Sequence, residues 1–152
     1  MPGAGRAALR RSRSLGRSSG RTVIVVDASV LATALADDAE DGRRARARLA
    51  GETVAVPELV DLEVLSVFRR LVRVGRLTDD RAGSARADLA ALPLRRAPHR
   101  HLLDRCWELR DNVTVYDAAY VALAEALDCA LLTSDGPLSR APGLRCAIEV
   151  VR

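Results

Sequence analysis

Four acidic residues stand where an α/β fold could bring carboxylates together. Asp27 follows the run VIVV, Glu63 lies in PELVDLEVLSVFRR, Asp117 lies in VTVYDAAYVALAEAL, and Asp135 follows ALLTS. Two of them, Asp27 and Asp135, close apolar runs that are typical of buried parallel strands. Carboxylates at such places are costly unless a cation meets them, and the chain contains no lysine. A cluster of oxygen ligands favours a hard divalent cation, Mg²⁺ or Mn²⁺.

The elements that must position these acids alternate along the chain. The sequence predicts strands at 23–26, 53–56, 92–96, 129–133 and 145–150, with helices at 29–36, 43–50, 58–74, 78–91, 98–110 and 117–127. This alternation predicts an α/β fold, a three-layer α/β/α domain with a five-stranded, mainly parallel sheet. With the strand order 3-2-1-4-5, the first and fourth strands are neighbours at the switch point, where such sheets bind ligands. Asp27 and Asp135 would then face each other.

Two of the acids could instead serve as helix caps. Asp27 could cap the helix that follows it, a common role for aspartate. Ser29 would then be either a donor to the Asp27 carboxylate or a part of the same cap. Asp117 occupies the third position of a capping box that begins at Thr114, and this role explains it without a metal. Capping and metal binding do not exclude each other.

The other two acids also have structural explanations. Glu63 lies beside an apolar stripe predicted for its helix and could be a solvated charge; the stripe comprises Leu59, Leu62, Leu65 and Phe68. Asp135 precedes Gly136 and Pro137, which suits a turn. The combination of four acids is therefore more specific than any one of them.

The positive charge is concentrated in the first 21 residues. Residues 1–21 contain six arginines and no acid, and they lack apolar periodicity, so we expect a disordered tail followed by one domain over 22–152. Such a tail could be a nucleic-acid-binding arm, or it could stem from an upstream-extended start codon or an expression remnant. Without it, 18 arginines face 20 acidic residues, a net charge of −2.

Composition excludes several classes of protein. No apolar run reaches the roughly 18 residues that cross a bilayer, so we expect no membrane segment. The three cysteines are widely spaced, which predicts reduced thiols in a cytoplasmic protein. The absence of lysine argues against a receiver-like phosphotransfer site. A dehalogenase-like phosphatase would need an aspartate where Ser29 stands.

The quoted segments resemble, in order and approximate spacing, those of the PIN domain over roughly residues 23–150. The closer resemblance is to VapC-type toxins of type II (VapBC) toxin–antitoxin systems. It implies an Mg²⁺- or Mn²⁺-dependent endoribonuclease, a hydrolase whose metal ligands are Asp27, Glu63, Asp117 and Asp135. It makes Ser29 and Thr133 accessory polar residues.

The same resemblance implies the partners: a cognate VapB-type antitoxin, an RNA substrate and a second copy of the chain in a homodimer. The sequence departs from the family at two places. Ser66 stands where many relatives have asparagine, and Gly136–Leu138 replace a further acid, so a second metal could be weakly held. The alternatives are a housekeeping PIN-fold RNA-processing nuclease and a non-catalytic RNA- or protein-binding module on the same fold.

Metal-activated water would leave a 5′-phosphate and a 3′-hydroxyl, and it requires no histidine. His99 and His101 lie away from the acids in sequence and are expected at the surface. Structured RNA with an exposed loop, of the tRNA or rRNA class, is the expected substrate. Because acids repel RNA, arginines must hold its backbone, although a solvated helix face explains any one of them. The candidates are Arg43, Arg44, Arg46 and Arg48, and separately Arg69, Arg70 and Arg73.

Overall fold

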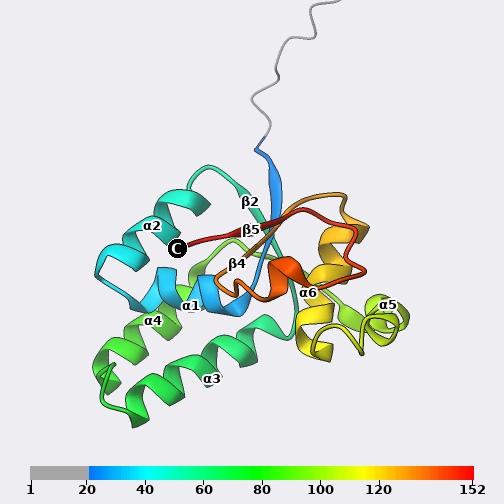
Figure 1. Cartoon of the computed structure of the whole chain (residues 1–152). Helices are drawn as coiled ribbons and strands as arrows, with labels where there is room; N and C mark the ends of the chain where they lie inside the picture. Colours follow the sequence, from blue (N-terminus) through cyan, green and yellow to red (C-terminus); the bar gives the residue numbers. More distant parts are fainter. Residues whose placement is uncertain (1–20) are drawn as a thin grey trace, which may run out of the picture.

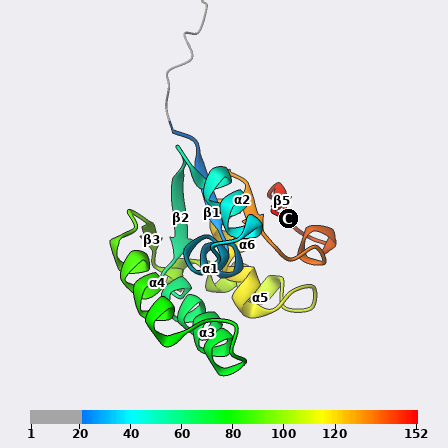
Figure 2. The same ribbon diagram turned by 90° about the vertical axis from the view of Figure 1, so that its left-hand side faces the viewer.

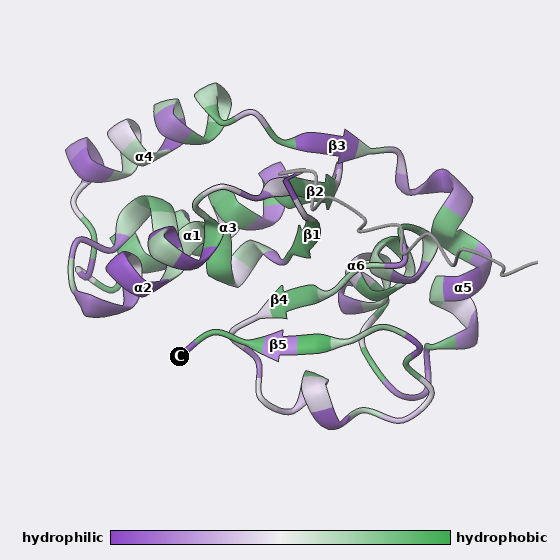
Figure 3. Cartoon of the chain, turned by 90° about the horizontal axis from the view of Figure 1, so that it is seen from above, coloured by the Kyte–Doolittle hydropathy of each residue, from purple (hydrophilic) through white to green (hydrophobic). Residues whose placement is uncertain are grey.

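The fold is built on one sheet of five parallel strands in the order β3-β2-β1-β4-β5. The computed structural model describes residues 21–152. Figure 3 shows the strand order from above. The predicted order and the α/β class are confirmed. The strands are β1 (Val23–Val26), β2 (Thr53–Pro57), β3 (Arg95–Ala97), β4 (Leu131–Thr133) and β5 (Ile148–Val150).

Helices cover both faces of this sheet, which confirms the three-layer arrangement. One group of helices lies on one side of the sheet and a second group lies on the other (Figures 1 and 3). The first group is α1 (Ala28–Ala36), α2 (Glu40–Leu49), α3 (Val60–Arg73) and α4 (Asp79–Ala91). The second group is α5 (Leu103–Glu108) and α6 (Val115–Ala126), with short 3₁₀ helices η1 (His99–Leu102) and η2 (Leu138–Arg140) nearby in the chain.

The core lies where β1, β4 and α6 meet. Val25 pairs with Leu131 across the two central strands, and both side chains are fully buried. In α6 every residue from Ala118 to Ala124 is buried. Its alanines let the helix pack closely on the sheet, and the buried run fixes the orientation of its first turn. Elements buried this deeply hold the residues at their ends in place, which matters because Asp27 and Asp117 occupy such ends.

Several predicted boundaries were wrong. Pro57 does not stop β2 but is its last residue, where it pairs with Ala97 of the edge strand β3 (Figure 2). The next helix begins at Val60 rather than at residue 58. The edge strand begins at Arg95 rather than at 92, and the segment 98–110 divides into η1 and α5. These differences are confined to element ends, where local propensity is weakest.

The apolar stripe predicted for α3 was wrong for two of its four residues: Phe68 is buried and Leu59 is partly buried against the core, but Leu62 and Leu65 are not buried. Leu62 is 71% exposed, and Leu65 is exposed as well. The buried face consists of Val60, Val64 and Phe68, which follow one another at four-residue spacing. The helix is apolar on more than one side, so its sequence alone did not decide which side packs on α1 and α4.

Residues 1–20, which contain nearly all of the predicted tail 1–21, lie outside the described residues. Between residues 21 and 152, none of the helices combines the length and the apolar character that crossing a membrane would require.

Candidate functional site

Asp27 is a buried carboxylate at the point where β1 passes into α1. Its side chain is 7% exposed, and three neutral groups donate hydrogen bonds to it. Oδ1 accepts from the Ser29 hydroxyl at 2.6 Å and from the Val30 amide at 3.1 Å. Oδ2 accepts from the Thr133 hydroxyl at 2.5 Å. Asp27 therefore caps α1 and at the same time presents a fixed carboxylate to the sheet edge.

The end of β4 is tied to the end of β1 through hydroxyl groups. The Asp135 amide donates to Thr133 Oγ1 at 2.9 Å, so the residue that orients Asp27 also anchors Asp135. The Ser134 hydroxyl donates to Ser29 Oγ at 2.6 Å. Ser134 was not singled out from the sequence, although its place beside Asp135 in LLTSD could have marked it. Asp135 is an exposed residue, whereas Asp27 is buried.

Glu63 is held by a buried tyrosine of α6. The hydroxyl of Tyr120, a residue that is 1% exposed, donates to Glu63 Oε1 at 3.0 Å. Burial raises the pKa of Glu63; the hydrogen bond from Tyr120 lowers it, and the charges of Asp117 and Asp27 raise it further. Tyr120 was missed in the sequence. Its position three residues after Asp117, one helical turn along α6, is the signal that could have found it.

Asp117 lies in the first turn of α6. Its amide donates to Thr114 Oγ1 at 3.1 Å, so the N-cap predicted for this helix is present. Burial raises the pKa of Asp117, hydrogen bonding with Thr114 lowers it, and the charges of Asp135 and Asp27 raise it. Asp117 acts in the same way on Glu63, so each of the four acids is linked to another through its charge, and we refer to these four residues as the electrostatic cluster.

The cluster is an oxygen-ligand set, but its members stand apart. Within residues 21–152 no group of three or more histidine, cysteine, aspartate or glutamate side chains is gathered closely enough to hold a metal ion. Carboxylates without a cation between them repel one another, and two of these also carry raised pKa values. The donor types suit Mg²⁺ or Mn²⁺ better than Zn²⁺, because no imidazole or thiolate is near them in sequence and His99 and His101 are exposed on η1.

Beside the cluster is a hollow of about 470 Å³. Asp117 and Asp135 line it together with Arg110, Asn112 and Thr114. Asp27 and Glu63 lie outside its walls. The hollow therefore gives two of the acids access to solvent, on the side of α6 where its first turn begins.

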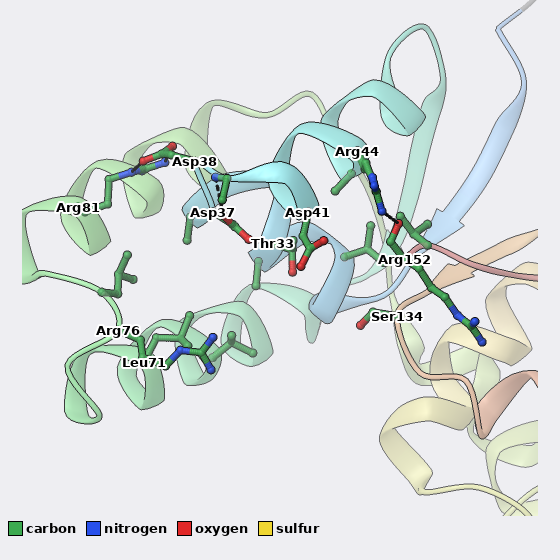
Figure 4. Close-up of a pocket in the computed structure, with 18 of the residues that line it drawn as sticks. Thr33, Asp37, Asp38, Asp41, Arg44, Leu71, Arg76, Arg81, Ser134 and Arg152 are labelled. Atoms are coloured by element: carbon green, nitrogen blue, oxygen red, sulfur yellow. Dashed lines mark hydrogen bonds and ion pairs between the residues drawn. The ribbon is translucent and has the colours of Figure 1, made fainter.

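A larger groove of about 1020 Å³ extends away from the cluster along α1. Figure 4 shows Ser134 and Arg152 at one end and Leu71, Arg76 and Arg81 at the other. The walls come from α1, α2, α3 and the start of α4. Ser134 connects this groove to the cluster, because its hydroxyl is bonded to Ser29.

The arginines predicted on the second helix are engaged within the fold. Arg43 and Arg44 pair with Glu40, and Arg48 pairs with Glu52 and Glu149. Arg46 donates to the carbonyl oxygens of Ala34 and Asp37 at the end of α1. Arg46 and Arg48 thereby hold α2 against neighbouring elements, whereas Arg43 and Arg44 pair with Glu40 inside the same helix at exposed positions. A part in RNA binding stays a prediction for these arginines. Arg69, Arg70 and Arg73 are exposed on α3.

Comparison with known proteins gives concordant similarities. The family described as PIN domain matches residues 24–144. Ribonuclease VapC9 of Mycobacterium tuberculosis is 44% identical over 129 residues, which is 85% of this chain and 98% of that protein. Ribonuclease VapC1 of the same organism is 44% identical over 132 residues, 84% of this chain and 97% of the other.

Solved structures share the fold at lower identity. Mycobacterium tuberculosis VapC20, a sarcin-ricin loop cleaving toxin, superimposes with a TM-score of 0.61 at 21% identity, covering 80% of this chain and 96% of VapC20. VapBC2 from Rickettsia felis, bound to a DNA fragment from its promoter, gives a TM-score of 0.62 at 15% identity, covering 86% and 100%.

Proposed function

This chain belongs to the PIN-domain family and, within it, to the VapC ribonucleases of toxin–antitoxin pairs, and we propose that it cleaves RNA with a divalent metal ion held by four acids, Asp27, Glu63, Asp117 and Asp135. Within residues 21–152 the four side chains stand too far apart to hold an ion as they are, so the ion would have to draw them together. The support for the metal is the charge that links these acids. Two of the carboxyls have pKa values raised partly by their neighbours, and a cation is what would relieve that repulsion. Mg²⁺ and Mn²⁺ match the all-oxygen donor set.

Buried residues of this chain orient the proposed metal ligands, and exposed residues border the path of the RNA. A bound Mg²⁺ or Mn²⁺ supplies an activated water and offsets charge on the leaving oxygen. Thr133 and Ser29 hold the Asp27 carboxylate in one orientation, and Tyr120 does the same for Glu63. Such supporting contacts orient ligands and are costly to remove. Asp135, at an exposed residue, borders the hollow through which RNA would approach.

The substrate that fits this site is an RNA loop. Loops of structured RNA present unpaired bases and a backbone that can reach the acids lining the hollow. Attack by water leaves a 5′-phosphate and a 3′-hydroxyl, so end-labelling of the products distinguishes it from attack by the 2′-hydroxyl, which leaves a cyclic phosphate. Cleavage of this kind belongs in the cytoplasm, where structured RNAs of the tRNA and rRNA class are found.

The groove along α1 is the proposed site of a VapB-type antitoxin. Its apolar lining includes Val67 and Leu71 of α3. A peptide in this groove would reach Ser134, whose hydroxyl adjoins the Asp27 network. From there an antitoxin arginine could pair with the cluster and displace the metal. The solved complexes VapBC2 of Rickettsia felis and a toxin–antitoxin pair of Klebsiella pneumoniae have toxins of this fold.

A homodimer would cover an exposed apolar surface on α3 and the start of α6. Leu62, Leu65, Val115 and Tyr116 are large apolar side chains exposed there. The bond between Tyr120 and Glu63 brings these two helices together. Exposed apolar surface of this kind often marks a protein interface. Sedimentation of wild-type protein and of a Leu62→Glu variant would test the assignment, since the variant should sediment as a monomer.

The deciding experiment is RNA cleavage by purified protein with Mg²⁺ or Mn²⁺. Wild type should cleave, Asp27→Asn should not, and Asp88→Asn, an exposed aspartate of α4, should cleave like wild type. In cells, wild type should arrest growth and a cognate antitoxin should relieve the arrest. Arrest that persists in Asp27→Asn would contradict the assignment of toxicity to this site. Cleavage without arrest would favour a housekeeping RNA-processing nuclease. Absence of both cleavage and arrest would favour a non-catalytic binding module.

A further inference from the structure

The hollow beside the acidic cluster contains a single basic side chain, that of Arg110, among the residues that line it. The other charged residues around it are Asp111, Asp117 and Asp135. RNA carries a negative charge on every phosphate, so a site lined by acids needs a cation to hold the strand. Arg110 is placed where it could do so, and it was not among the arginines singled out from the sequence.

The guanidinium of Arg110 is held by local and exposed contacts. Its Nη1 donates to the Trp107 carbonyl at 2.7 Å, and its Nη2 lies 3.9 Å from Asp111 Oδ2. The Asp111 side chain is 82% exposed, so water screens that pair and little of the arginine charge is spent on it. By contrast, Arg105 and Arg48 each bind two carboxylates. The remaining donors of Arg110 are available to a phosphate.

Arg110 also lies against the chain's single tryptophan. Its Cζ is 4.6 Å from the centroid of the Trp107 ring, a cation–π contact. Trp107 nevertheless remains 65% exposed on the outer side of α5. An indole in this position offers a flat apolar surface next to a cation. That pairing is what proteins use to bind an unpaired base together with its phosphate.

A second arginine, Arg140, lies close to Gly136, the residue after Asp135. Arg140 Nη1 is 3.8 Å from the point that a Cβ at Gly136 would occupy. Within residues 21–152 Arg140 forms no ion pair. Arg140 is therefore a further cation near the hollow that is not neutralised by an ion pair in this part of the chain.

We propose that Trp107 and Arg110 form a nucleotide subsite of the RNA-cleaving site. Arg110 binds a phosphate that neighbours the cleaved one, and Trp107 stacks on the unpaired base attached to it. The inference rests on the proposed function. A second copy of the chain is the rival occupant of Trp107. A second copy packed on Trp107 would bury the Arg110 guanidinium, and the exposed Asp111 would be its counter-charge on this chain. A bound phosphate brings its own negative charge to the guanidinium.

Intrinsic fluorescence tests the subsite directly, because Trp107 is the sole tryptophan. The protein is used in the Asp27→Asn background with Mg²⁺, since Asp27 lies outside the walls of the hollow. The probe is a synthetic RNA hairpin with an unpaired purine loop, titrated against a fully paired RNA duplex of the same stem. The hairpin should quench the fluorescence saturably, and the duplex should not.

Four variants separate the contribution of base stacking on Trp107 from that of phosphate binding by Arg110. Trp107→Ala should raise the dissociation constant for the hairpin about tenfold or more, measured by gel shift, while Trp107→Phe keeps most of the affinity. Arg110→Gln should make the negative slope of log K against log salt less steep by about 0.7, and Arg110→Lys should retain the wild-type slope. Arg86→Gln, an exposed arginine of α4, is the matched control and should change neither quantity.

Several results would overturn the subsite. One is hairpin binding with unchanged fluorescence; another is equal affinity of Trp107→Ala, Arg110→Gln and Arg86→Gln for the hairpin. If Trp107→Ala converts a sedimenting dimer to a monomer and leaves RNA affinity per protomer unchanged, Trp107 belongs to a contact between copies. These readouts require no cleavage. The proposed function would instead fail if wild-type protein showed no metal-dependent cleavage, and this result is distinct from the binding results above.

Discussion

Replacing Thr133 by valine should disturb both the stability of the fold and the geometry of the site. The side chain is fully buried, and its hydroxyl donates to Asp27 Oδ2 and accepts from the Asp135 amide. Valine keeps the shape and removes both bonds, so no cavity contributes. Water cannot take the place of the hydroxyl at a site with no exposure. The change therefore isolates the value of two hydrogen bonds.

The magnitude follows from the two partners. A hydrogen bond to a charged group contributes about 1.5–3 kcal/mol, and one from a backbone amide about 0.5–1.5 kcal/mol. Thr133→Val should therefore lower the free energy of unfolding by about 2–4 kcal/mol. At about 3 °C per kcal/mol for a domain of this size, the midpoint of thermal unfolding should fall by about 6–12 °C. Cleavage should fall about 10- to 100-fold, as for other residues that orient metal ligands.

Urea and thermal unfolding in chelator, followed by circular dichroism, measure the first effect, and cleavage of a loop RNA measures the second. Thr53→Val is the matched control, because Thr53 lies in the same sheet and its hydroxyl forms no side-chain hydrogen bond in the described part of the chain. If the two variants lose the same stability, the Thr133 hydroxyl does not hold Asp27 as described.

Three further outcomes follow from the acids. Asp27→Asn should abolish cleavage and lower the pKa of Glu63 and Asp117 in a carboxyl ¹³C NMR titration; unchanged values would refute the electrostatic cluster. Tyr120→Phe should raise the pKa of Glu63, because it removes the hydrogen bond that lowers this pKa in wild type. The variant should also cleave about 10- to 100-fold more slowly while keeping a native circular dichroism spectrum. Because the folded-state pKa values of Glu63 and Asp117 lie above the ordinary 4.5 and 3.8, their stabilising contribution is full below those values and is lost as pH rises through the raised ones. Metal-free protein should therefore gain stability in urea as pH falls from neutral toward 4.5, and Asp27→Asn should gain less.

The site illustrates how one residue can satisfy two explanations at once. Asp27 caps α1 through Oδ1 and receives Thr133 at Oδ2, so the cap proposed from its sequence position does not compete with a role at the sheet edge. Asp117 likewise combines a capped helix start with membership of the acidic cluster. Local sequence signals identified the caps, but only contacts between distant segments joined these residues to one site.

The sequence by itself determined the class of fold, the strand order and the places of the four acids. Short β-branched and leucine-rich runs alternate with helical segments, and this local pattern leaves few arrangements for a parallel sheet. Asp27 and Asp135 follow directly from such runs, so their meeting at one edge was predictable. The family resemblance of the same segments was equally a property of the sequence.

Only the tertiary structure decided which side chains complete the site. Leu62 was expected to be buried and is exposed, because α3 is apolar on more than one side and its packing partners choose the face. Tyr120 reaches Glu63 across 57 positions of sequence, and Arg110 enters the hollow beside Asp135. No local period encodes such contacts. They depend on the distance and relative orientation of two packed elements, which the whole core sets rather than any one segment.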